Sequence, residues 1–133
     1  MLKFVHHIQY VVNNRDEFVV YMEKNFGLKP DELEEREAGS KHALYKIGQT
    51  EMQVSEPAPG SGQAQYLAQH GPGVAHVAWA IDDAAQVAQQ LKAKGNTLRG
   101  EQGFTQSPHG YSAINIDPKD SAGIHFQLIE DRR

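Results

Sequence analysis

Two stretches of the chain, residues 5–12 and residues 74–81, carry hydrophobic and polar residues in the same order. Each stretch alternates with a period of two, which predicts a β-strand. Each one then runs into a polar pair and a segment whose apolar residues recur at helical spacing. A strand and a helix that occur twice predict a duplicated structural unit.

Each copy presents one histidine at the same position of its strand. His7 and His76 both lie on the face opposite the larger apolar side chains. Neutral imidazole is a common ligand of first-row metals, so two histidines brought together by a pseudo-twofold axis provide half of a metal site. A single histidine in a strand is more often hydrogen-bonded or exposed, and the equivalence of the two positions is what favours a ligand role.

The first copy predicts a β-α-β-β unit. Asn13 or Asn14 can cap its helix, and Gly27 is a typical helix end. The apolar residues of this helix, which we expect to face the sheet, are Phe18, Val19, Met22 and Phe26. The predicted elements are a strand over about 4–12, a helix from about 15 to 26, strands over about 43–47 and 51–55, and a candidate extra strand over 33–37.

The second copy follows a Pro- and Gly-rich segment, residues 58–62, and a candidate short helix over 63–70. Its predicted elements are a strand over about 74–81, a helix over 84–94, and strands over about 112–116 and 123–129. In the last strand, one face is expected to carry Ile124, Phe126 and Leu128. The other face is expected to carry His125 and Gln127.

A length of 133 residues suits one compact domain, residues 1–133. We interpret the chain as a first module over about 1–57, a linker over about 58–72 and a second module over about 73–133. The chain holds no cysteine, so disulfides and thiolate metal sites are excluded. Any metal must therefore be held by histidine, carboxylate or amide oxygen.

The formal net charge of -4 argues against a nucleic-acid partner, because the lysines and arginines are scattered and do not form a basic patch. No run approaches the roughly 20 apolar residues that a membrane span needs. The N-terminus leads straight into a strand without the apolar core of a signal peptide. We therefore expect a cytoplasmic protein with no membrane partner.

The same alternation, followed through four strands, predicts one polar inner face. Its members are His7, Gln53, His76 and Gln127, with Gln9, Tyr111, Asn115 and His125 as nearby candidates. The two inner glutamines are weaker ligand candidates than the histidines, because amide oxygen is a poor ligand for borderline metals. Solvated or structural roles are the alternative for both.

Several segments, in order along almost the whole chain, carry a family resemblance: Phe4-Val5-His6-His7-Ile8, residues 46–57, residues 73–83, Ser107-Pro108-His109-Gly110, Asp117-Pro118-Lys119-Asp120 and residues 123–128. They resemble the vicinal-oxygen-chelate superfamily, which includes glyoxalase I, bleomycin-resistance proteins, extradiol dioxygenases and methylmalonyl-CoA epimerase. Within it, the chain looks most like the epimerase branch. The resemblance implies an α+β fold in which two β-α-β-β-β modules form an eight-stranded, incompletely closed mixed sheet around a metal cleft.

The resemblance also implies that His7, Gln53 and His76 occupy three of the epimerase ligand positions, around a divalent cation such as cobalt, nickel, zinc or manganese. At the fourth position, where the family has a glutamate, this chain has Gln127. Loss of the carboxylate leaves an all-neutral set of ligands. Such a set should bind a cation more weakly but leave it a stronger Lewis acid.

Two neighbours of Gln127 bear on the missing carboxylate. His125 has the right parity to substitute for it, whereas Glu130 lies on the opposite face and would need a bulge to reach the site. The departure argues against an iron extradiol dioxygenase, whose usual site has two histidines and one carboxylate.

The chemistry implied by the resemblance is removal of a proton next to a carbonyl, while two substrate oxygens chelate the metal and the resulting enolate is stabilised. The family has an acid/base glutamate in the acidic stretch, where the candidates here are Glu34, Glu35 and Glu37. A solvated acidic loop is the alternative for that stretch. The candidates for substrate binding or proton handling are His109, Tyr111 and His125.

The leading hypothesis is a metal-dependent epimerase or glyoxalase-like lyase that acts on a CoA thioester or on a glutathione-type adduct. The alternative is a metal-free small-molecule binding protein of the bleomycin-resistance type, which the neutral Gln127 favours. A third alternative is an enzyme with a different substrate, because this fold supports many reactions. The resemblance further implies a homodimer.

Overall fold

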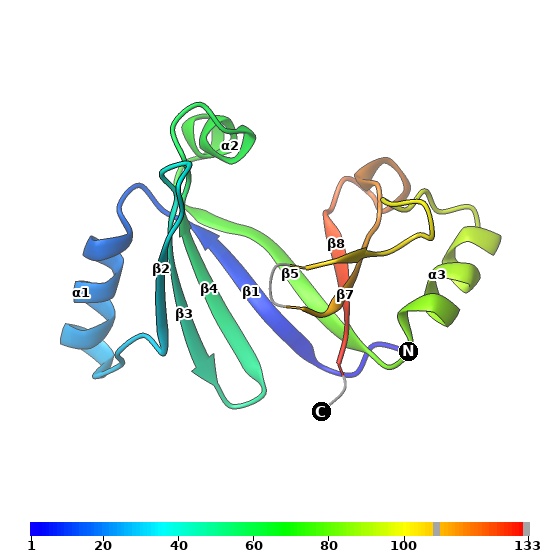
Figure 1. The fold of residues 1–133 in the computed structure, drawn as a ribbon, viewed down its shortest axis with the longest axis horizontal. Helices are drawn as coiled ribbons and strands as arrows, with labels where there is room; N and C mark the ends of the chain where they lie inside the picture. Colours follow the sequence, from blue (N-terminus) through cyan, green and yellow to red (C-terminus); the bar gives the residue numbers. More distant parts are fainter. Residues whose placement is uncertain (108–109, 132–133) are drawn as a thin grey trace. The chain divides into compact units, whose positions relative to one another are not determined.

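The computed structural model describes residues 1–107 and 110–131. Over these residues it contains three α-helices and an eight-stranded mixed sheet that is not closed, which confirms the predicted α+β fold (Figure 1). The chain divides into two compact units. We call His7–Ala75 the N-terminal unit, and Met1–His6 together with the chain from His76 onwards the C-terminal unit. The assignment of one domain with module boundaries near residues 57 and 73 stays a prediction.

The elements of the first half are β1 (Val5–Val11), α1 (Arg15–Phe26), β2 (Glu32–Glu35), β3 (Lys41–Ile47), β4 (Thr50–Glu56) and α2 (Gly62–His70). β3 pairs antiparallel with β2 and with β4, and β1 pairs parallel with β4. The strand order of the N-terminal unit is therefore β2-β3-β4-β1. Helix α1 packs against β3 and β4 (Figure 1).

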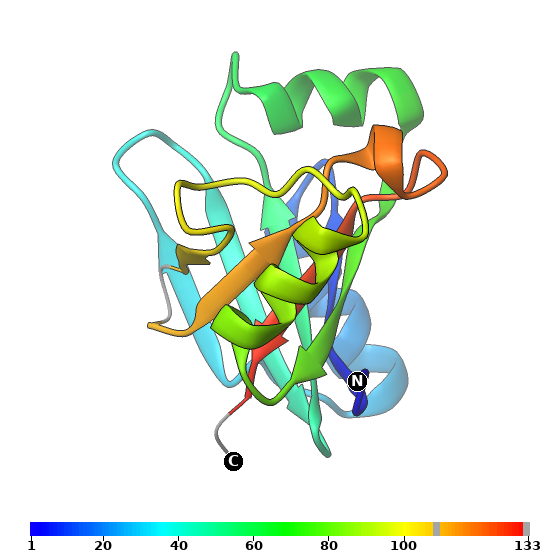
Figure 2. The same ribbon diagram turned by 90° about the vertical axis from the view of Figure 1, so that its right-hand side faces the viewer.

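The elements of the second half are β5 (Gly73–Ile81), α3 (Ala84–Ala93), β6 (Thr105–Gln106), β7 (Ser112–Asn115), the 3-10 turn η1 (Pro118–Asp120) and β8 (Phe126–Glu130). β5 pairs parallel with β8, and β7 pairs antiparallel with β8 and with β6. Helix α3 packs against β7 and β8, as Figure 2 shows. The order β5-β8-β7-β6 repeats the order β1-β4-β3-β2, so the predicted duplication is confirmed at the level of topology.

Helix α1 begins with a cap that the sequence predicts, and helix α3 begins with a side-chain cap from Asp83, in the polar pair that precedes it. The side chain of Asn14 accepts a hydrogen bond from the backbone N–H of Glu17, and Asp83 accepts one from the N–H of Gln86. Such side-chain caps satisfy N–H groups that the first helical turn leaves without a partner. Gly27 ends α1 with a φ of 66°, a left-handed conformation that glycine adopts readily.

A carboxylate from a distant strand satisfies a further N–H group at the start of each of these helices. Oε1 of Glu56, the last residue of β4, accepts a hydrogen bond from the backbone N–H of Arg15 at 2.9 Å. Oε1 of Glu130, the last residue of β8, accepts one from the N–H of Ala84 at 3.1 Å. The two units therefore tie helix to sheet by the same contact.

The helices cover the apolar faces of the sheets. In the N-terminal unit the buried core consists of Met22, Ala43, Tyr45 and Val54, with Phe18 and Val19 packed against it. In the C-terminal unit the larger cluster contains Ile81, Ala84, Val87, Ala88, Ile114, Ile116 and Leu128, with Trp79 and Leu91 packed against it. The helix faces predicted from periodicity are confirmed at these positions.

Three expectations about elements were wrong. Phe26 is 62% exposed, because it ends α1 and its ring packs on Tyr21 instead of on the sheet. The last strand begins at Phe126 and not at Gly123, and Ile124 is therefore 57% exposed.

The turn before β8 explains the later start. The N–H of Gly123 donates to the carbonyl of Pro118, and the hydroxyl of Ser121 donates to the carbonyl of Ile124, so these residues are held outside the sheet.

The third difference between the expected and observed elements is an omission, since the two-residue strand β6 was not predicted.

Within the described part of the chain, no helix combines the length and the apolar character needed to cross a lipid bilayer.

Candidate metal and substrate site

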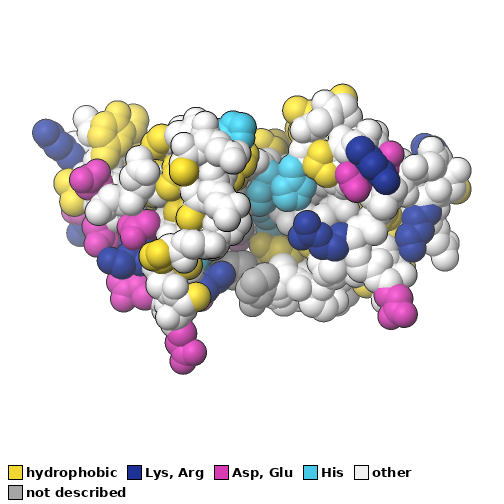
Figure 3. All heavy atoms as spheres, turned by 90° about the horizontal axis from the view of Figure 1, so that it is seen from above, with side chains coloured by type: hydrophobic (Ala, Val, Ile, Leu, Met, Phe, Trp, Pro, Cys, Tyr) yellow, Lys and Arg dark blue, Asp and Glu magenta, His cyan; other side chains and the backbone are white. Residues whose placement is uncertain are grey.

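Four polar side chains form a cluster on the sheet of the C-terminal unit. His76 lies on β5, Asn115 ends β7, His125 immediately precedes β8 and Gln127 lies on β8. The ring centroids of His76 and His125 are 4.8 Å apart, and the register of β7 and β8 pairs Asn115 with Gln127. Figure 3 shows histidine side chains at the molecular surface.

Asn115 orients the cluster. Its Oδ1 accepts a hydrogen bond from Nε2–H of His125 at 2.9 Å and another from the Nε2 amide of Gln127 at 3.2 Å. The Gln127 amide therefore uses its nitrogen for Asn115. Its carbonyl oxygen, Oε1, is buried and has no hydrogen-bond partner among the described residues. Because a buried polar atom without a partner costs free energy, Oε1 marks a place for a ligand.

The pKa of both histidines in this cluster is lowered, which favours the neutral form of each ring. Burial, assisted by the neighbouring His125, lowers the pKa of His76 from 6.5 to about 4, while Gln127 acts in the opposite direction as a hydrogen-bonding neighbour. Gln127 lies near His76, but its Oε1 has no partner in hydrogen-bond geometry among the described residues. Burial, followed by the charge of Arg99, lowers the pKa of His125 as well. Neutral imidazole is the form that binds metals.

The register of the N-terminal sheet places His7 and Gln53 on one face. β1 and β4 pair with His7 opposite Glu51 and Gln9 opposite Gln53, so His7 and Gln53 are diagonal neighbours. His7 is 3% exposed. Nε2 of Gln53 donates to Oε1 of Glu51 at 3.3 Å. This part of the predicted inner face is therefore polar, as the alternation indicates.

The donors of the two units are imidazoles and amides. Among the described residues, no group of three or more histidine, aspartate and glutamate side chains is arranged to hold a metal ion. His76 and Gln127 belong to the C-terminal unit, and His7 and Gln53 to the N-terminal unit. That these four residues converge on one metal stays a prediction.

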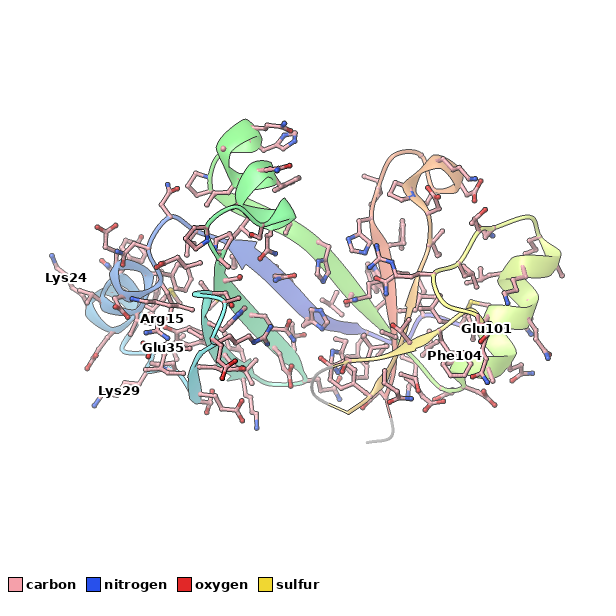
Figure 4. All side chains as sticks on the ribbon, turned by 45° about the horizontal axis from the view of Figure 1, so that its top comes forward. Arg15, Lys24, Lys29, Glu35, Glu101 and Phe104 are labelled. Atoms are coloured by element: carbon pink, nitrogen blue, oxygen red, sulfur yellow. The ribbon has the colours of Figure 1, made fainter. Side chains whose placement is uncertain are left out.

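Glu35, one of the three candidate acid/base glutamates, takes part in a structural ion pair. Nη2 of Arg15 lies 3.0 Å from Oε1 of Glu35, and Figure 4 shows the two side chains together. Arg15 is 4% exposed, and its Nη1 also donates to the carbonyl groups of Glu34 and His42. Arg15 therefore ties the start of α1 to the β2–β3 hairpin. Nothing in the alternation predicted this role.

The other two candidates, Glu34 and Glu37, lie on β2 and in the turn that follows it. The pairing of β2, β3 and β4 places Glu34 on the sheet face that carries Gln53, where its Oε1 accepts a hydrogen bond from Nε of Arg36 at 2.9 Å. Glu37 lies in the turn between β2 and β3, which the N–H of Gly39 closes by donating to the carbonyl of Arg36 at 2.9 Å. Both carboxylates are exposed.

The substrate-binding candidates have different outcomes. The ring of Tyr111 packs at 5.0 Å and 71° against His6, and it lies beside the buried cluster of Ala78, Ala113 and Ile129. Ala78 shares its strand face with His76, so Tyr111 is on the face of the histidine cluster. His109 lies outside the described residues. His6, which is 5% exposed, was not predicted as a site residue, although its place next to His7 was the available signal.

Glu130 behaves as the parity of its strand predicts. Its carboxylate holds the first turn of α3, on the face opposite the polar cluster, and no bulge brings it to Gln127. Glu130 therefore does not supply the carboxylate that is missing at Gln127.

Comparisons of the sequence and the structure with known proteins agree on one protein family. A family model described as the glyoxalase/bleomycin resistance protein/dioxygenase superfamily matches residues 6–113. No curated protein matches the chain. A methylmalonyl-CoA epimerase solved in complex with methylmalonyl-CoA and NH4+ is 25% identical, with a TM-score of 0.82 over 97% of this chain and 94% of that chain.

Two further structures agree. A selenomethionine form of methylmalonyl-CoA epimerase is 27% identical, with a TM-score of 0.82 over 97% of this chain and 95% of that chain. A Glu-to-Gln variant of the Streptomyces coelicolor epimerase in complex with 2-nitronate-propionyl-CoA is 24% identical, with a TM-score of 0.84 over 100% of both chains, and it supports the fold alone. Because the family model covers most of the sequence, the chain belongs to the glyoxalase/bleomycin resistance protein/dioxygenase superfamily.

Proposed function

We propose that this protein is a metal-dependent epimerase or glyoxalase-like lyase that removes a proton next to a carbonyl group. Membership of the superfamily and the likeness to methylmalonyl-CoA epimerases support the proposal. The observation that carries it is the neutral His76 beside the buried Oε1 of Gln127, which has no hydrogen-bond partner among the described residues. An imidazole nitrogen and a free carbonyl oxygen are both donors for a divalent cation.

The proposed ligands are His7, Gln53, His76 and Gln127. They fit a cation such as cobalt, nickel, zinc or manganese, because Oε1 of Gln127 needs a partner that attracts a carbonyl oxygen. When bound, the cation would act as a Lewis acid that polarises the substrate carbonyl and so acidifies the adjacent C–H bond. A neutral set of ligands leaves the charge of the cation uncompensated, which favours this polarisation and weakens the affinity for the metal.

We assign proton removal to Glu34 or Glu37. A catalytic base must come within hydrogen-bond reach of the proton it takes, and both carboxylates are exposed to an incoming substrate. Glu35 is the weaker candidate, since its carboxylate is bonded to the buried Arg15. Tyr111 then positions the substrate on the sheet face of the C-terminal unit, and His125 and His109 stay candidates for the same role.

A CoA thioester is the proposed substrate, with a glutathione-type adduct as the alternative. One epimerase similar to this chain was solved with methylmalonyl-CoA. Burial and, after it, the positive charge of Arg99 lower the pKa of His125, so the guanidinium of Arg99 is near enough to the cluster for an anionic substrate to neutralise its charge. A substrate with a carboxylate next to its thioester meets this requirement. A homodimer and a cytoplasmic location stay expectations.

A metal-free binding protein is the second candidate function. The observation that favours it is the amide at Gln127, because an all-neutral donor set has a weak hold on a cation. Substitution of His76 by alanine separates the two functions. It should abolish metal-dependent turnover in an enzyme, whereas a sequestering protein should keep most of its affinity for a small molecule.

Cobalt binding tests the metal half of the proposal. Chelator-stripped protein is titrated with Co(II) in a calorimeter, beside the double variant His7→Ala, His76→Ala. We expect one ion per chain for the natural protein and loss of binding in the double variant. If the natural protein binds no cobalt up to about a millimolar, where the binding free energy is only about -4 kcal/mol, metal dependence is wrong and sequestration takes its place.

A further inference from the structure

We propose that His125 is an additional imidazole donor to the cation, beside His76, and that Asn115 holds it in the tautomer that this role requires. The inference rests on the proposed function, because it concerns the same cation. It adds a third imidazole nitrogen to a proposed donor set of two histidines and two glutamine amides.

The hydrogen bond to Asn115 defines the protonation of His125. Oδ1 of an asparagine can only accept, so the proton of the neutral His125 ring is on Nε2, which lies 2.9 Å from that oxygen. The lone pair of Nδ1 is then available. Histidines that bind metals commonly donate their other ring N–H to an oxygen acceptor, which fixes the tautomer and the ring orientation. The hydrogen bond from His125 to Asn115 has this arrangement.

The neighbours of His125 are also donors. Its ring centroid lies 4.8 Å from that of His76, and the planes are inclined by 49°, so the rings are not stacked in parallel. The same Asn115 oxygen holds the nitrogen of the Gln127 amide, at 3.2 Å. Asn115 thereby leaves two lone-pair donors in one cluster, Nδ1 of His125 and Oε1 of Gln127, and the second of these has no partner.

In the hydrogen-bond network of Asn115, His125 and Gln127, Oε1 of Gln127 is buried, and leaving this acceptor atom without a partner costs free energy of folding. Asn115 is 8% exposed, and a half-satisfied buried network is less stable than a fully satisfied one. A cation that accepts the lone pairs of His76, His125 and Gln127 completes the network. In this reading Asn115 is a positioning residue, because it acts on the metal through two ligands and does not touch it.

The decisive variant is His125→Gln. Glutamine can still donate an amide N–H to Asn115, but it removes the imidazole nitrogen. We expect it to weaken Co(II) binding at least tenfold, in line with the 10- to 100-fold losses known for residues that support metal ligands, and to change the visible absorption of bound cobalt. His70→Gln, on the exposed end of α2, is the matched control and should bind cobalt as the natural protein does.

A second readout needs no variant and guards against misfolding. Nitrogen-15 NMR of the natural protein should show His125 protonated on Nε2, and Zn(II) should shift the Nδ1 resonance of His125 together with that of His76. Asn115→Leu should lose the single tautomer and about tenfold in cobalt affinity.

The outcomes separate the two claims. If His125→Gln binds cobalt as tightly as the natural protein, or if zinc leaves Nδ1 of His125 unshifted while His76 responds, the assignment of His125 is wrong and the proposed function stands. If the natural protein itself binds neither cobalt nor zinc, the metal-dependent function fails and His125 has no such role.

Discussion

At the scale of single residues, hydrogen bonding determines which atom each polar side chain offers. Alternation along the strands placed His76 and Gln127 on one face, and the register of β5 and β8 confirms that placement, because it pairs Gln127 with Ala78, two residues along the strand from His76. The alternation of polar and apolar residues predicts the strand face on which Gln127 lies, but not whether its amide oxygen or its amide nitrogen points into the cluster. The contact that turns Oε1 of Gln127 into a buried atom without a partner comes from Asn115, a residue of a different strand.

The lowered pKa of His76 predicts a pH dependence of stability for the metal-free protein. Unfolded His76 takes up its proton near its ordinary pKa of 6.5, whereas the folded protein does so only near 4. The unfolded state therefore binds more protons in this window, so the free energy of unfolding falls as the pH drops from about 6.5 to about 4. His125, whose pKa is also lowered, acts in the same direction.

Urea unfolding between pH 4 and pH 7 measures this effect. His76→Gln should flatten the pH dependence, because glutamine does not titrate, while His70→Gln on the exposed surface should keep the slope of the natural protein. An unchanged slope in His76→Gln would mean that the histidine is not held neutral by burial.

The acid/base assignment predicts unequal effects of two conservative substitutions. One of Glu34→Gln and Glu37→Gln should slow proton exchange at the substrate carbon by about a hundredfold or more, as expected for loss of a general base. The other should keep most of the rate. Glu17→Gln, on the exposed surface of α1, is the control. Natural rates in both glutamate variants would exclude these two residues, and the rate is followed by NMR of the substrate in D2O.

At the scale of elements, local signals were predicted well and contacts from distant residues were not. Asn14 and Gly27 are caps that sequence position alone indicates, and both act as caps, while Asp83, in the polar pair before α3, caps that helix. Glu56 and Glu130 accept hydrogen bonds from the first residues of α1 and α3, at sequence separations of 41 and 46 residues. No local pattern contains such a contact.

The start of the last strand shows the same limit. Apolar alternation continues backwards from Leu128 to Ile124, so the strand was predicted to begin at Gly123. Hydrogen bonds inside the turn over residues 118–124 outweigh that pattern and hold Ile124 outside the sheet. Arg15 is a further case, since its burial depends on the β2–β3 hairpin that it contacts.

The distant carboxylates predict a matched pair of stability losses. Glu56→Ala and Glu130→Ala each remove the acceptor of a backbone N–H at the start of a helix, and we expect each to lower the free energy of unfolding by about 1 kcal/mol. Because the two contacts are equivalent in the two units, the losses should be similar. Glu101→Ala, at an exposed position, is the control. Denaturant unfolding checks the effect, and stability unchanged in both variants would contradict it.

At the scale of the whole molecule, duplication is the feature that the sequence revealed most clearly. The equivalent positions of His7 and His76 predicted two copies of one unit, and the strand orders β1-β4-β3-β2 and β5-β8-β7-β6 confirm it. The family resemblance gave the eight-stranded sheet, which is also confirmed. The substrate was not predictable in this way, since a fold and a donor set are compatible with several carbonyl compounds.

The most direct test of the proposed function is solvent deuterium uptake. Methylmalonyl-CoA is incubated in D2O with the chelator-stripped protein, with and without Co(II), and the deuterium at the carbon between the two carbonyl groups is measured by mass spectrometry. The account predicts uptake that requires both protein and cobalt and that His76→Ala abolishes. Uptake no faster than in buffer with cobalt alone would contradict epimerase-type proton abstraction from this substrate.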